Sequence, residues 1–356
     1  MYTITLEVNQ ICNFRCRYCY LGEKTEEVMR RETALKGLEV AFKNAQHHRD
    51  RKLWVDFVGG ETLISFGIIK ELSEYIDWEA EKKDMNVTYS ITTNGSIMNM
   101  EIYKWLVEKR VHIKLSVDGT EETHNRNRIL KDGQGTYRII KEKLPTFQKY
   151  ENITGIKIQG THVITKNNYM EFFLSIKHLV EEIGLNVVDS SIDLSCQWSY
   201  EDLQVIVEEW RKIIQYYNDR VKTGKPFLWG MLLDMQKYEK EKSICSLCGV
   251  GMKQIYIRTN GDIYGCAANL KSTGKLGDIE RGINITRLRR YQQTNQESAA
   301  CKKCDAHTKC TVKGCIMNHL YFSGNAGIPN DVMCFLERKR QELWKDSYIH
   351  FGIAEK

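Results

Sequence analysis

The sequence predicts an α/β protein that consists of a partial, TIM-like (β/α)6 barrel followed by a small cysteine-rich domain. Six short apolar or alternating runs recur in residues 1–199, with helical patterns between them. A polar motif follows each of the first five runs, and eight of the 12 cysteines lie beyond residue 244. Alternating strands and helices are typical of right-handed βαβ units around a parallel sheet, and six strands are fewer than the eight of a closed barrel.

The barrel elements follow from the pattern of apolar residues. Strands are predicted at 3–8, 53–58, 87–92, 111–117, 156–165 and 185–194. Helices are predicted between them, near 26–46, 67–83, 99–110, 136–150 and 168–183. The motifs that follow the strands are three early cysteines, then GGE (59–61), TTNG (92–95), SVDG (116–119) and TKNN (165–168). Since the carboxyl ends of parallel strands share one rim, these motifs are expected to form one site.

Beyond the barrel, residues 1–199, the chain divides into a helical bridge, residues 200–244, and a second domain, residues 245–356. The second domain is rich in Cys, Gly and Lys and has few apolar runs, so bound metal is expected to contribute to its stability. In the bridge, residues 200–221 place seven apolar side chains on one helical face, which predicts core packing: Leu203, Ile206, Val207, Trp210, Ile213, Ile214 and Tyr217.

The composition excludes some classes of protein. No apolar run approaches the ~18 residues of a membrane span, and the N-terminus lacks the basic start and apolar core of a signal peptide. A cytoplasmic location without membrane attachment is therefore predicted. The net charge of +6 is spread along the chain and does not by itself predict nucleic-acid binding. In a reduced compartment, 12 cysteines indicate metal ligands rather than disulfides.

Cys12, Cys16 and Cys19 form a Cys-x3-Cys-x2-Cys motif with no fourth cysteine nearby. Three thiolates can hold three irons of a [4Fe–4S] cluster and leave the fourth iron open. An open coordination position is typical of a catalytic metal site. A zinc knuckle is the structural alternative, but such a site needs four ligands.

With Tyr18 before its last cysteine, this motif resembles the signature of the radical S-adenosylmethionine (SAM) superfamily. The resemblance implies that SAM binds the open iron and that its reductive cleavage yields a 5′-deoxyadenosyl radical. Glu61 resembles the family's acceptor for the cofactor amino group, and glycines before it would let the backbone approach a ligand. Many relatives have proline where this chain has Thr62. The implied cofactor contacts are Tyr18, Gly59, Gly60, Glu61, Asn94, Ser116, Asp118 and Arg128.

The late cysteines resemble the SPASM domain, an iron–sulfur module with two auxiliary [4Fe–4S] clusters in radical enzymes that modify peptides and proteins. The chain matches its Gly-x4-Cys element at Gly261 and Cys266 but has one extra residue before Cys315. A zinc ribbon is the alternative, but the gap from Cys248 to Cys301 is far longer than the ~15–20 residues usual between zinc-ribbon pairs. The resemblance implies two sets of four ligands: Cys245, Cys248, Cys266 and Cys315 for the first cluster, and Cys301, Cys304, Cys310 and Cys334 for the second.

The resemblance implies an oxidoreductase and leaves two reactions open. One is the maturation of a ribosomally made peptide by a thioether or related cross-link; the other is that of an anaerobic sulfatase-maturating enzyme, which makes formylglycine. Sulfatase-maturating enzymes carry an aspartate after the cysteine of GDIYGC, where this chain has Ala267. Alanine cannot be a general base, so the peptide maturase is favoured. The catalytic base is not identified by the sequence; the candidates are Asp118, Glu122, His124 and His162.

The same resemblance implies a precursor peptide as partner and an electron donor such as flavodoxin or ferredoxin. The chain begins at its first predicted strand, so either a separate protein recognises the leader of the peptide or the enzyme binds its peptide directly. No nucleic-acid partner is predicted, because the second domain resembles no common RNA-binding module. A non-catalytic iron–sulfur carrier would explain the late cysteines but not the open site or the rim motifs.

Overall fold

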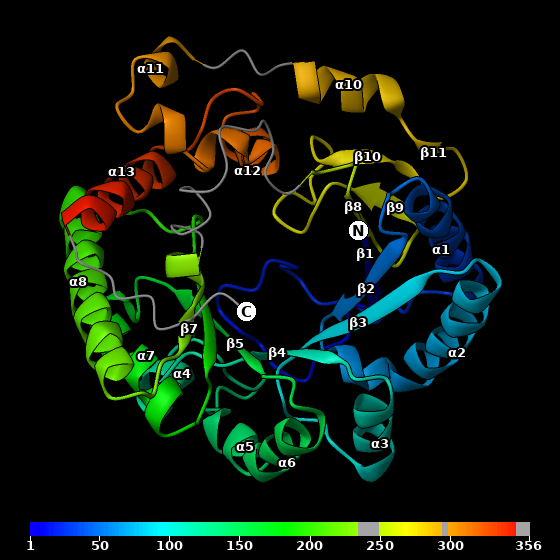
Figure 1. The fold of residues 1–356 in the computed structure, drawn as a ribbon, viewed down its shortest axis with the longest axis horizontal. Coiled ribbons are helices and arrows are strands. Elements are labelled where there is room, and N and C mark those ends of the chain that lie inside the picture. Colours follow the sequence, from blue (N-terminus) through cyan, green and yellow to red (C-terminus); the bar gives the residue numbers. More distant parts are fainter. Residues whose placement is uncertain (234–248, 294–297, 347–356) are drawn as a thin grey trace.

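The computed structural model describes residues 1–233, 249–293 and 298–346. Within these ranges, 11 strands form one sheet in the order β11-β10-β9-β8-β1-β2-β3-β4-β5-β6-β7. Strands β1 to β7 follow a ring with the helices on its outer side (Figure 1). These strands pair in parallel in chain order: β1 (Tyr2–Asn9), β2 (Lys52–Gly59), β3 (Asn86–Thr93), β4 (His112–Ser116), β5 (Gln159–Ile164), β6 (Val187–Ile192) and β7 (Leu228–Trp229). The predicted partial barrel is confirmed.

Helices alternate with these strands. The predicted helix at 136–150 is two helices, because Pro145 in the first turn of the second one cannot donate a backbone hydrogen bond. The predicted helix at 168–183 begins with a 3-10 turn, η2 (Tyr169–Glu171). The helices of this part of the chain are α1 (Arg31–Gln46), α2 (Phe66–Lys82), α3 (Met100–Glu108), α4 (Glu121–Asn125), α5 (Tyr137–Lys141), α6 (Leu144–Thr154), α7 (Phe172–Glu181) and α8 (Tyr200–Lys222).

The first helix begins at Arg31 rather than near residue 26, because the segment before it is bonded to β1. Val28 forms an isolated bridge with Asn9, and the backbone N–H of Met29 donates to the carbonyl of Val8 at 2.9 Å. Residues 10–27 therefore form a loop with both ends fixed at the carboxyl end of β1. This loop, the cysteine loop below, carries the three early cysteines.

The C-terminal segment continues the same sheet, although the sequence predicted no strands there. β8 (Gln254–Ile257) pairs in parallel with β1, and β9 (Asp262–Tyr264), β10 (Lys275–Asp278) and β11 (Gly282–Ile283) follow as antiparallel neighbours. Strands of two to four residues are too short to show a clear alternation in the sequence. The remaining helices are α10 (Ile285–Gln293), α11 (Ala299–Lys302), α12 (Ile316–Phe322) and α13 (Asp331–Asp346). The boundaries of the three predicted segments remain predictions.

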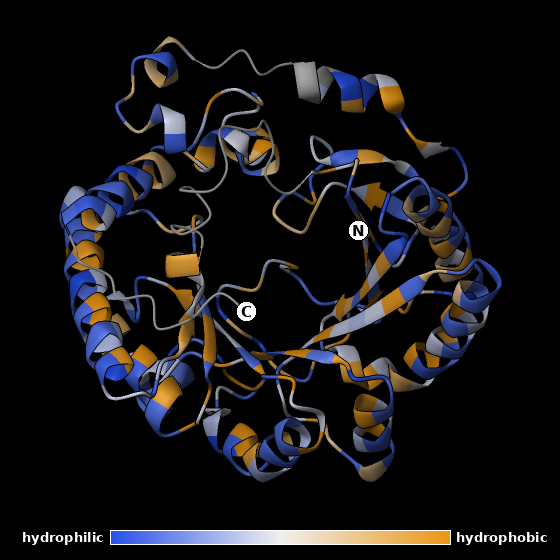
Figure 2. Cartoon of the chain, viewed as in Figure 1, coloured by the Kyte–Doolittle hydropathy of each residue, from blue (hydrophilic) through white to orange (hydrophobic). Residues whose placement is uncertain are grey.

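The predicted apolar face of α8 is core. All seven of its side chains are buried, and the helix packs against α7 and η2. On the other side α13 contacts α8, where the rings of Tyr200 and Phe335 are 5.5 Å apart. The outer helices carry both hydrophilic and hydrophobic residues, as amphipathic helices that cover a sheet do (Figure 2). No helix within the described ranges is long and apolar enough to span a bilayer.

The face of the central strands turned away from α1 is polar. Glu7 on β1 is fully buried, accepts a hydrogen bond from the hydroxyl of Tyr256 at 2.7 Å and pairs with Arg258 at 3.3 Å. On the same face Asp56 of β2 pairs with Lys114 of β4 at 3.0 Å. Buried charges are tolerated where they are paired and hydrogen-bonded, so these pairs make a polar barrel interior possible. The first pair also ties the C-terminal segment to the barrel.

Candidate active site

The cysteine loop is fixed to a second rim segment, residues 126–130. Phe14 is fully buried and forms an isolated bridge with Leu130. The backbone N–H of Arg15 donates to the carbonyl of Ile129 at 2.6 Å. The loop is therefore held between the end of β1 and the segment that follows α4, which limits the positions its thiols can take.

Cys12, Cys16 and Cys19 lie on this loop as free, half-buried thiols. The backbone N–H of Cys19 donates to the carbonyl of Cys16 at 3.2 Å, so these two share one turn. Burial raises the pKa of Cys12 to about 11 and also raises the pKa of Cys16. Metal binding is what would hold such thiols as thiolates.

Three cysteines on one loop fit the donor set of an iron–sulfur cube with one open iron. An iron–sulfur cube takes one thiolate on each iron, so its ligands do not need to meet at one point. A mononuclear zinc knuckle, the structural alternative, does need such convergence.

Lys24 is a site residue that the sequence analysis missed. Its Nζ donates to Sγ of Cys19 at 2.5 Å, and its charge also lowers the pKa values of Cys12 and Cys16 against the larger effect of burial. No motif marks this lysine, because a loop returns it to the thiols five residues after the last of them.

Gly59 and Gly60 have a packing role that the sequence did not reveal. A Cβ on Gly60 would lie 2.2 Å from the carbonyl oxygen of Ile11, and one on Gly59 would lie 2.7 Å from that of Asn9. The backbone N–H of Glu61 donates to the same Ile11 oxygen at 2.7 Å. The close approach in the structure is therefore between two protein backbones, directly before Cys12. Contact of these glycines with SAM remains a prediction.

We expect Gly60→Ala to lower the free energy of unfolding by about 1–3 kcal/mol, because the new methyl group overlaps a backbone carbonyl that cannot rotate away. Gly67→Ala is the matched control, since no atom lies within 4 Å of the added Cβ and α2 is helical there. The control is expected to be neutral or to stabilise by up to about 1 kcal/mol. Chemical denaturation of both variants measures the difference. Equal stability of the two variants would show that the backbone of the cysteine loop moves away from the added methyl group at low cost.

Glu61 follows Gly60 beyond the end of β2, is buried, and its carboxylate is already hydrogen-bonded. Oε1 accepts from Oγ1 of Thr93 at 2.7 Å and from the N–H of Leu63 at 3.1 Å, and Oε2 accepts from the N–H of Asn94 at 2.7 Å. Burial raises its pKa although these donors oppose the shift. Thr62, where relatives have proline, donates its hydroxyl to the carbonyl of Thr92 at 2.6 Å. This bond ties the ends of β2 and β3 together.

Asn94 lies next to the thiol of Cys12. Nδ2 of Asn94 donates to Oδ1 of Asn13 at 2.9 Å and lies 3.9 Å from Sγ of Cys12. Ser116 ends β4, is half-buried and forms no side-chain hydrogen bond within the described part of the chain. Both remain predicted cofactor contacts.

Asp118 is the centre of a buried network behind the cysteine loop. Its carboxylate accepts from the hydroxyl of Tyr18 at 2.5 Å and from Nη2 of Arg128 at 3.3 Å. Nε of Arg128 lies 3.0 Å from Oδ2 as an ion pair, without the alignment of a hydrogen bond. Burial alone would raise the pKa of Asp118, but Arg128 holds it below its usual value. Tyr18, Asp118 and Arg128, which are three of the predicted cofactor contacts, therefore hold one another in position.

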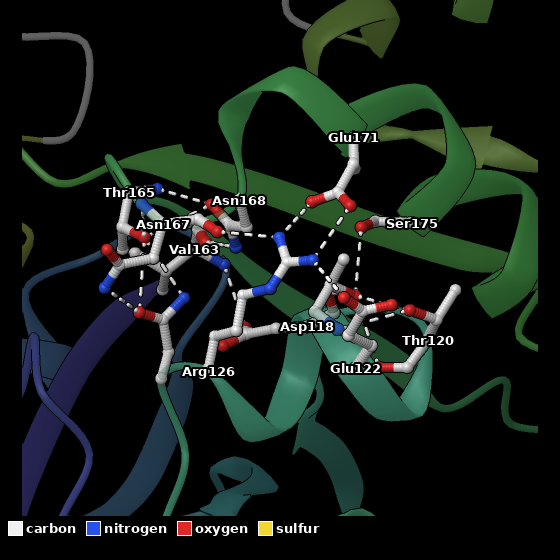
Figure 3. Close-up of polar contacts among 12 residues, drawn as sticks. Asp118, Thr120, Glu122, Arg126, Val163, Thr165, Asn167, Asn168, Glu171 and Ser175 are labelled. Atoms are coloured by element: carbon white, nitrogen blue, oxygen red, sulfur yellow. Dashed lines mark hydrogen bonds and ion pairs between the residues drawn. The ribbon is translucent and has the colours of Figure 1, made fainter.

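Asp118 is bonded to β5, and the segment after it is bonded to the β5–α7 connection (Figure 3). The backbone N–H of Val163 donates to Asp118 at 3.1 Å. Arg126 lies between two carboxylates and pairs with both Glu122 and Glu171. Glu122, a candidate base, is 77% exposed and pairs with Arg126 one helical turn away. The sequence analysis missed Arg126 because its partner lies 45 residues away.

The two candidate histidines are buried and neutral. Nδ1 of His124 accepts from the N–H of Asp118 at 3.2 Å, and burial lowers the pKa of His124 to about 3. His162 stacks on Phe172 with ring centroids 5.1 Å apart, and neither of its ring nitrogens has a hydrogen-bond partner among the described residues. Burial lowers the pKa of His162 to about 4. The rings of His124 and His162 are therefore both part of the buried interior.

We expect His162 to make the protein less stable in mild acid. The unfolded chain protonates this ring near pH 6.5, whereas the folded chain keeps it neutral down to about pH 4. Stability is therefore highest above pH 6.5 and falls as the pH drops toward 4, by about 1.4 kcal/mol at pH 5.5. Relative to wild type, His162→Leu should gain that amount between pH 7.5 and 5.5 in urea titrations. The exposed His47, as His47→Gln, is the control, and a gain equal to that of the control would contradict the prediction.

The predicted ligands of the second auxiliary cluster meet in one pocket. Its lining comes from α11, the segment around η3 (His307–Lys309) and α13. The lining residues are Cys301, Cys304, Ala306, His307, Cys310, Lys313, Pro329, Cys334, Glu337 and Arg338. Four thiols around one pocket fit a closed four-cysteine cluster.

The first auxiliary set is seen only in part. Cys266 packs on a small apolar cluster that includes Val250 and Met317, and Cys315 directly precedes α12 of the same cluster. Nδ2 of Asn318 lies 3.2 Å from Sγ of Cys315. The other two predicted ligands, Cys245 and Cys248, lie outside the described residues. Cys315 is not among the residues that line the second pocket.

Comparisons with known proteins decide the family. Residues 6–176, which hold the cysteine loop and all the rim motifs, match the Radical SAM superfamily. This part of the chain belongs to the radical SAM superfamily. Members of this superfamily bind SAM and a [4Fe–4S] cluster.

Three proteins resemble this radical SAM protein in sequence. An uncharacterized protein of Methanocaldococcus jannaschii is 27% identical over 280 residues, 78% of this chain and 88% of the relative. A cysteine-type anaerobic sulfatase-maturating enzyme of Clostridium novyi is 24% identical over 339 residues, 86% of this chain and 85% of the relative. A radical SAM cyclopropyl synthase of Paramaledivibacter caminithermalis is 21% identical over 327 residues, 86% of this chain and 66% of the relative.

Two solved structures share the fold. Native anSMEcpe with bound AdoMet superimposes with a TM-score of 0.78 at 19% identity, over 97% of each chain. Streptococcus suis SuiB bound to precursor peptide SuiA superimposes with a TM-score of 0.61 at 15% identity, over 93% of this radical SAM protein and 75% of SuiB. The shared fold therefore extends beyond the barrel into the cysteine-rich C-terminal segment.

Proposed function

We propose that the protein is a radical SAM maturase that modifies a ribosomally made peptide and forms a thioether or related cross-link. In this proposal Cys12, Cys16 and Cys19 hold a [4Fe–4S] cluster with one open iron, which supplies the electron that cleaves bound SAM. Two closed auxiliary clusters are held by the C-terminal cysteines, one by Cys245, Cys248, Cys266 and Cys315, the other by Cys301, Cys304, Cys310 and Cys334. The residues proposed to contact SAM are Tyr18, Gly59, Gly60, Glu61, Asn94, Ser116, Asp118 and Arg128.

The residue at position 267 favours peptide cross-linking over formylglycine formation. Its methyl group packs on a cluster of Val58, Tyr256 and Tyr264, beside the end of β2. Sulfatase-maturating enzymes are expected to place an aspartate here as a proton acceptor, whereas the methyl group of Ala267 supplies no base.

Overall similarity favours a second candidate, a sulfatase-maturating enzyme. Such an enzyme of Clostridium novyi aligns over 86% of this chain, and native anSMEcpe has a TM-score of 0.78. Identities of 24% and 19% are compatible with a shared fold and a different reaction. Formylglycine formation would then need a base at a position other than 267.

Two solved relatives support a peptide as substrate. SuiB is bound to precursor peptide SuiA, and native anSMEcpe is bound to AdoMet and the Cp18Cys peptide. We infer that this radical SAM protein also takes a peptide into its polar barrel interior. The proposed partners are an electron donor such as flavodoxin or ferredoxin and, where the peptide has a leader, a separate leader-recognition protein. Its proposed location is the cytoplasm.

Mass spectrometry of two substrates tests the proposal. The anaerobically reconstituted enzyme is given SAM, reductant and either a cysteine-rich precursor peptide encoded beside its gene or a cysteine-containing sulfatase peptide. A cross-link removes two hydrogen atoms from the peptide, whereas formylglycine formation from cysteine removes sulfur and two hydrogens and adds oxygen. We expect the first change on the precursor and no change on the sulfatase peptide. Formylglycine on the sulfatase peptide would establish the second candidate instead.

A further inference from the structure

The backbone of the cysteine loop is held on both sides of Lys24. Before it, the N–H of Gly22 donates to the carbonyl of Cys19 at 3.0 Å, and Gly22 has a φ of 65°, a left-handed conformation that glycine adopts without strain. After it, the hydroxyl of Thr25 donates to Oε1 of Gln10 at 2.8 Å. These two bonds return the chain to the thiols and place Nζ of Lys24 2.5 Å from Sγ of Cys19.

The ammonium group of Lys24 is paired with a thiol instead of a carboxylate. Lys24 forms no ion pair within the described part of the chain, and Sγ of Cys19 is the hydrogen-bond acceptor of its Nζ there. Its acidic neighbours in the sequence, Glu23 and Glu26, have exposed side chains, whereas Lys24 is half-buried. Water therefore screens these two carboxylates more strongly than it screens the contact of the lysine with the sulfur.

Other cations near the thiols are arranged differently. Arg128 lies close enough to Cys16 to lower the pKa of that thiol, but its own charge is paired with the buried Asp118 at 3.0 Å. Arg15 donates to the backbone carbonyls of residues 12 and 14 and not to a sulfur atom. Among these cations, Lys24 is the one whose charge is in direct contact with a predicted ligand sulfur.

A cation in this position affects the charge balance of an iron–sulfur cluster. The reduced form of a cluster carries one more negative charge than the oxidised form, so a nearby positive charge stabilises the reduced form more. Hydrogen bonds to the ligand sulfurs are also among the features that set the reduction potential of such clusters. Since the three thiols are half-buried, solvent only partly screens this effect.

We propose that Lys24 raises the reduction potential of the iron–sulfur cluster at Cys12, Cys16 and Cys19. The inference rests on the proposed function, because it takes these three cysteines as the ligands of that cluster. The step that the lysine favours is the transfer of one electron from an external reductant to the cluster, with no bond made or broken. Lys24 acts on the cluster through the sulfur of Cys19.

Potentiometric titration of reconstituted holoenzyme with dithionite, followed by electron paramagnetic resonance, tests the proposal. The relevant cluster is recognised as the signal that changes when SAM is added and that the variant Cys12→Ala/Cys16→Ala/Cys19→Ala lacks. Lys24→Met removes the charge and the hydrogen bond at similar side-chain length, and Lys24→Arg keeps both. The control, Lys43→Met, removes an exposed lysine of α1 that forms no ion pair within the described ranges. Iron content is measured for every sample.

At the midpoint potential of the wild type, we expect the ratio of reduced to oxidised cluster to be at least about tenfold lower in Lys24→Met, which corresponds to about 59 mV for a one-electron couple. Lys24→Arg and Lys43→Met should stay within about twofold of wild type, because the first keeps the cation and the second removes one far from the thiols.

Three results would overturn the proposal: an unchanged ratio in Lys24→Met, an equal fall in Lys24→Arg or Lys43→Met, and the loss of about four irons from Lys24→Met. The last result would show that the lysine serves cluster assembly and not its potential. If the ratio changes as expected but no peptide is modified, the proposed function fails and the role of Lys24 stands.

Discussion

The variant Cys12→Ala/Cys16→Ala/Cys19→Ala is expected to lose all cleavage of SAM while keeping its fold. Three clusters would give the reconstituted wild type about 12 irons per chain, and the variant about 8, because only the open-iron cluster is lost. The cysteine loop does not depend on its thiols, since Phe14 is buried and the loop is bonded to residues 8 and 129. Iron and sulfide analysis and chromatography of 5′-deoxyadenosine measure both effects.

Cys196→Ala is the matched control for this experiment. Cys196 lies outside all three cysteine sets, is half-buried and donates its thiol to Asp193 at 3.3 Å. Its replacement should leave iron content and SAM cleavage unchanged. A wild type with about 4 irons and a triple variant with none would show that the C-terminal cysteines hold zinc or no metal. The auxiliary-cluster assignment and the peptide-maturase proposal would then have to be given up.

Arg128→Met is expected to destabilise the fold by about 3–5 kcal/mol, because it leaves a buried carboxylate without its cation. Asp118 is fully buried, and the remaining donors within the described residues are the hydroxyl of Tyr18 and the N–H of Val163. Removal of the guanidinium should also raise the pKa of Asp118, so that the carboxyl takes up a proton at higher pH. Urea unfolding at pH 7.5 measures the loss of stability.

Arg138→Met is the control for this test. It removes an ion pair that is exposed to solvent rather than buried. Arg138 pairs with Glu121 at 2.8 Å, but the two side chains are 82% and 45% exposed. Exposed ion pairs contribute little, so this control should cost less than about 1 kcal/mol. The double variant Asp118→Asn/Arg128→Met should recover part of the loss, because it removes the unpaired charge. A single variant as stable as the control would show that water or a rearranged side chain replaces Arg128.

Local pattern was enough to predict the barrel and the position of its rim. Apolar runs located all six long strands, and the parallel order placed their carboxyl ends at one edge, where the cysteine loop, Glu61 and Asn94 do meet. Resemblance to the SPASM domain assigned Cys301, Cys304, Cys310 and Cys334 to one site, and these four cysteines line one pocket. The strands and the position of the rim depend on residue type and spacing along the chain, which the sequence states directly.

Contacts between distant residues could not be predicted in this way. The carboxylate of Glu7 meets Tyr256 across 249 positions, and Arg126 meets Glu171 across 45. The neutral state of His162 also depends on its burial against Phe172, which no spacing reveals.

The sequence by itself determined the family of this protein, because three thiols with an open fourth position and an ordered set of rim motifs are statements about chemistry and order. Only the tertiary structure decided that Gly60 serves a backbone–backbone contact with Ile11 and that Ala267 packs against Val58, Tyr256 and Tyr264. The reason is physical. Side-chain burial, ion pairing and close backbone contact depend on which segments lie side by side, and only folding brings segments that are distant in the sequence together.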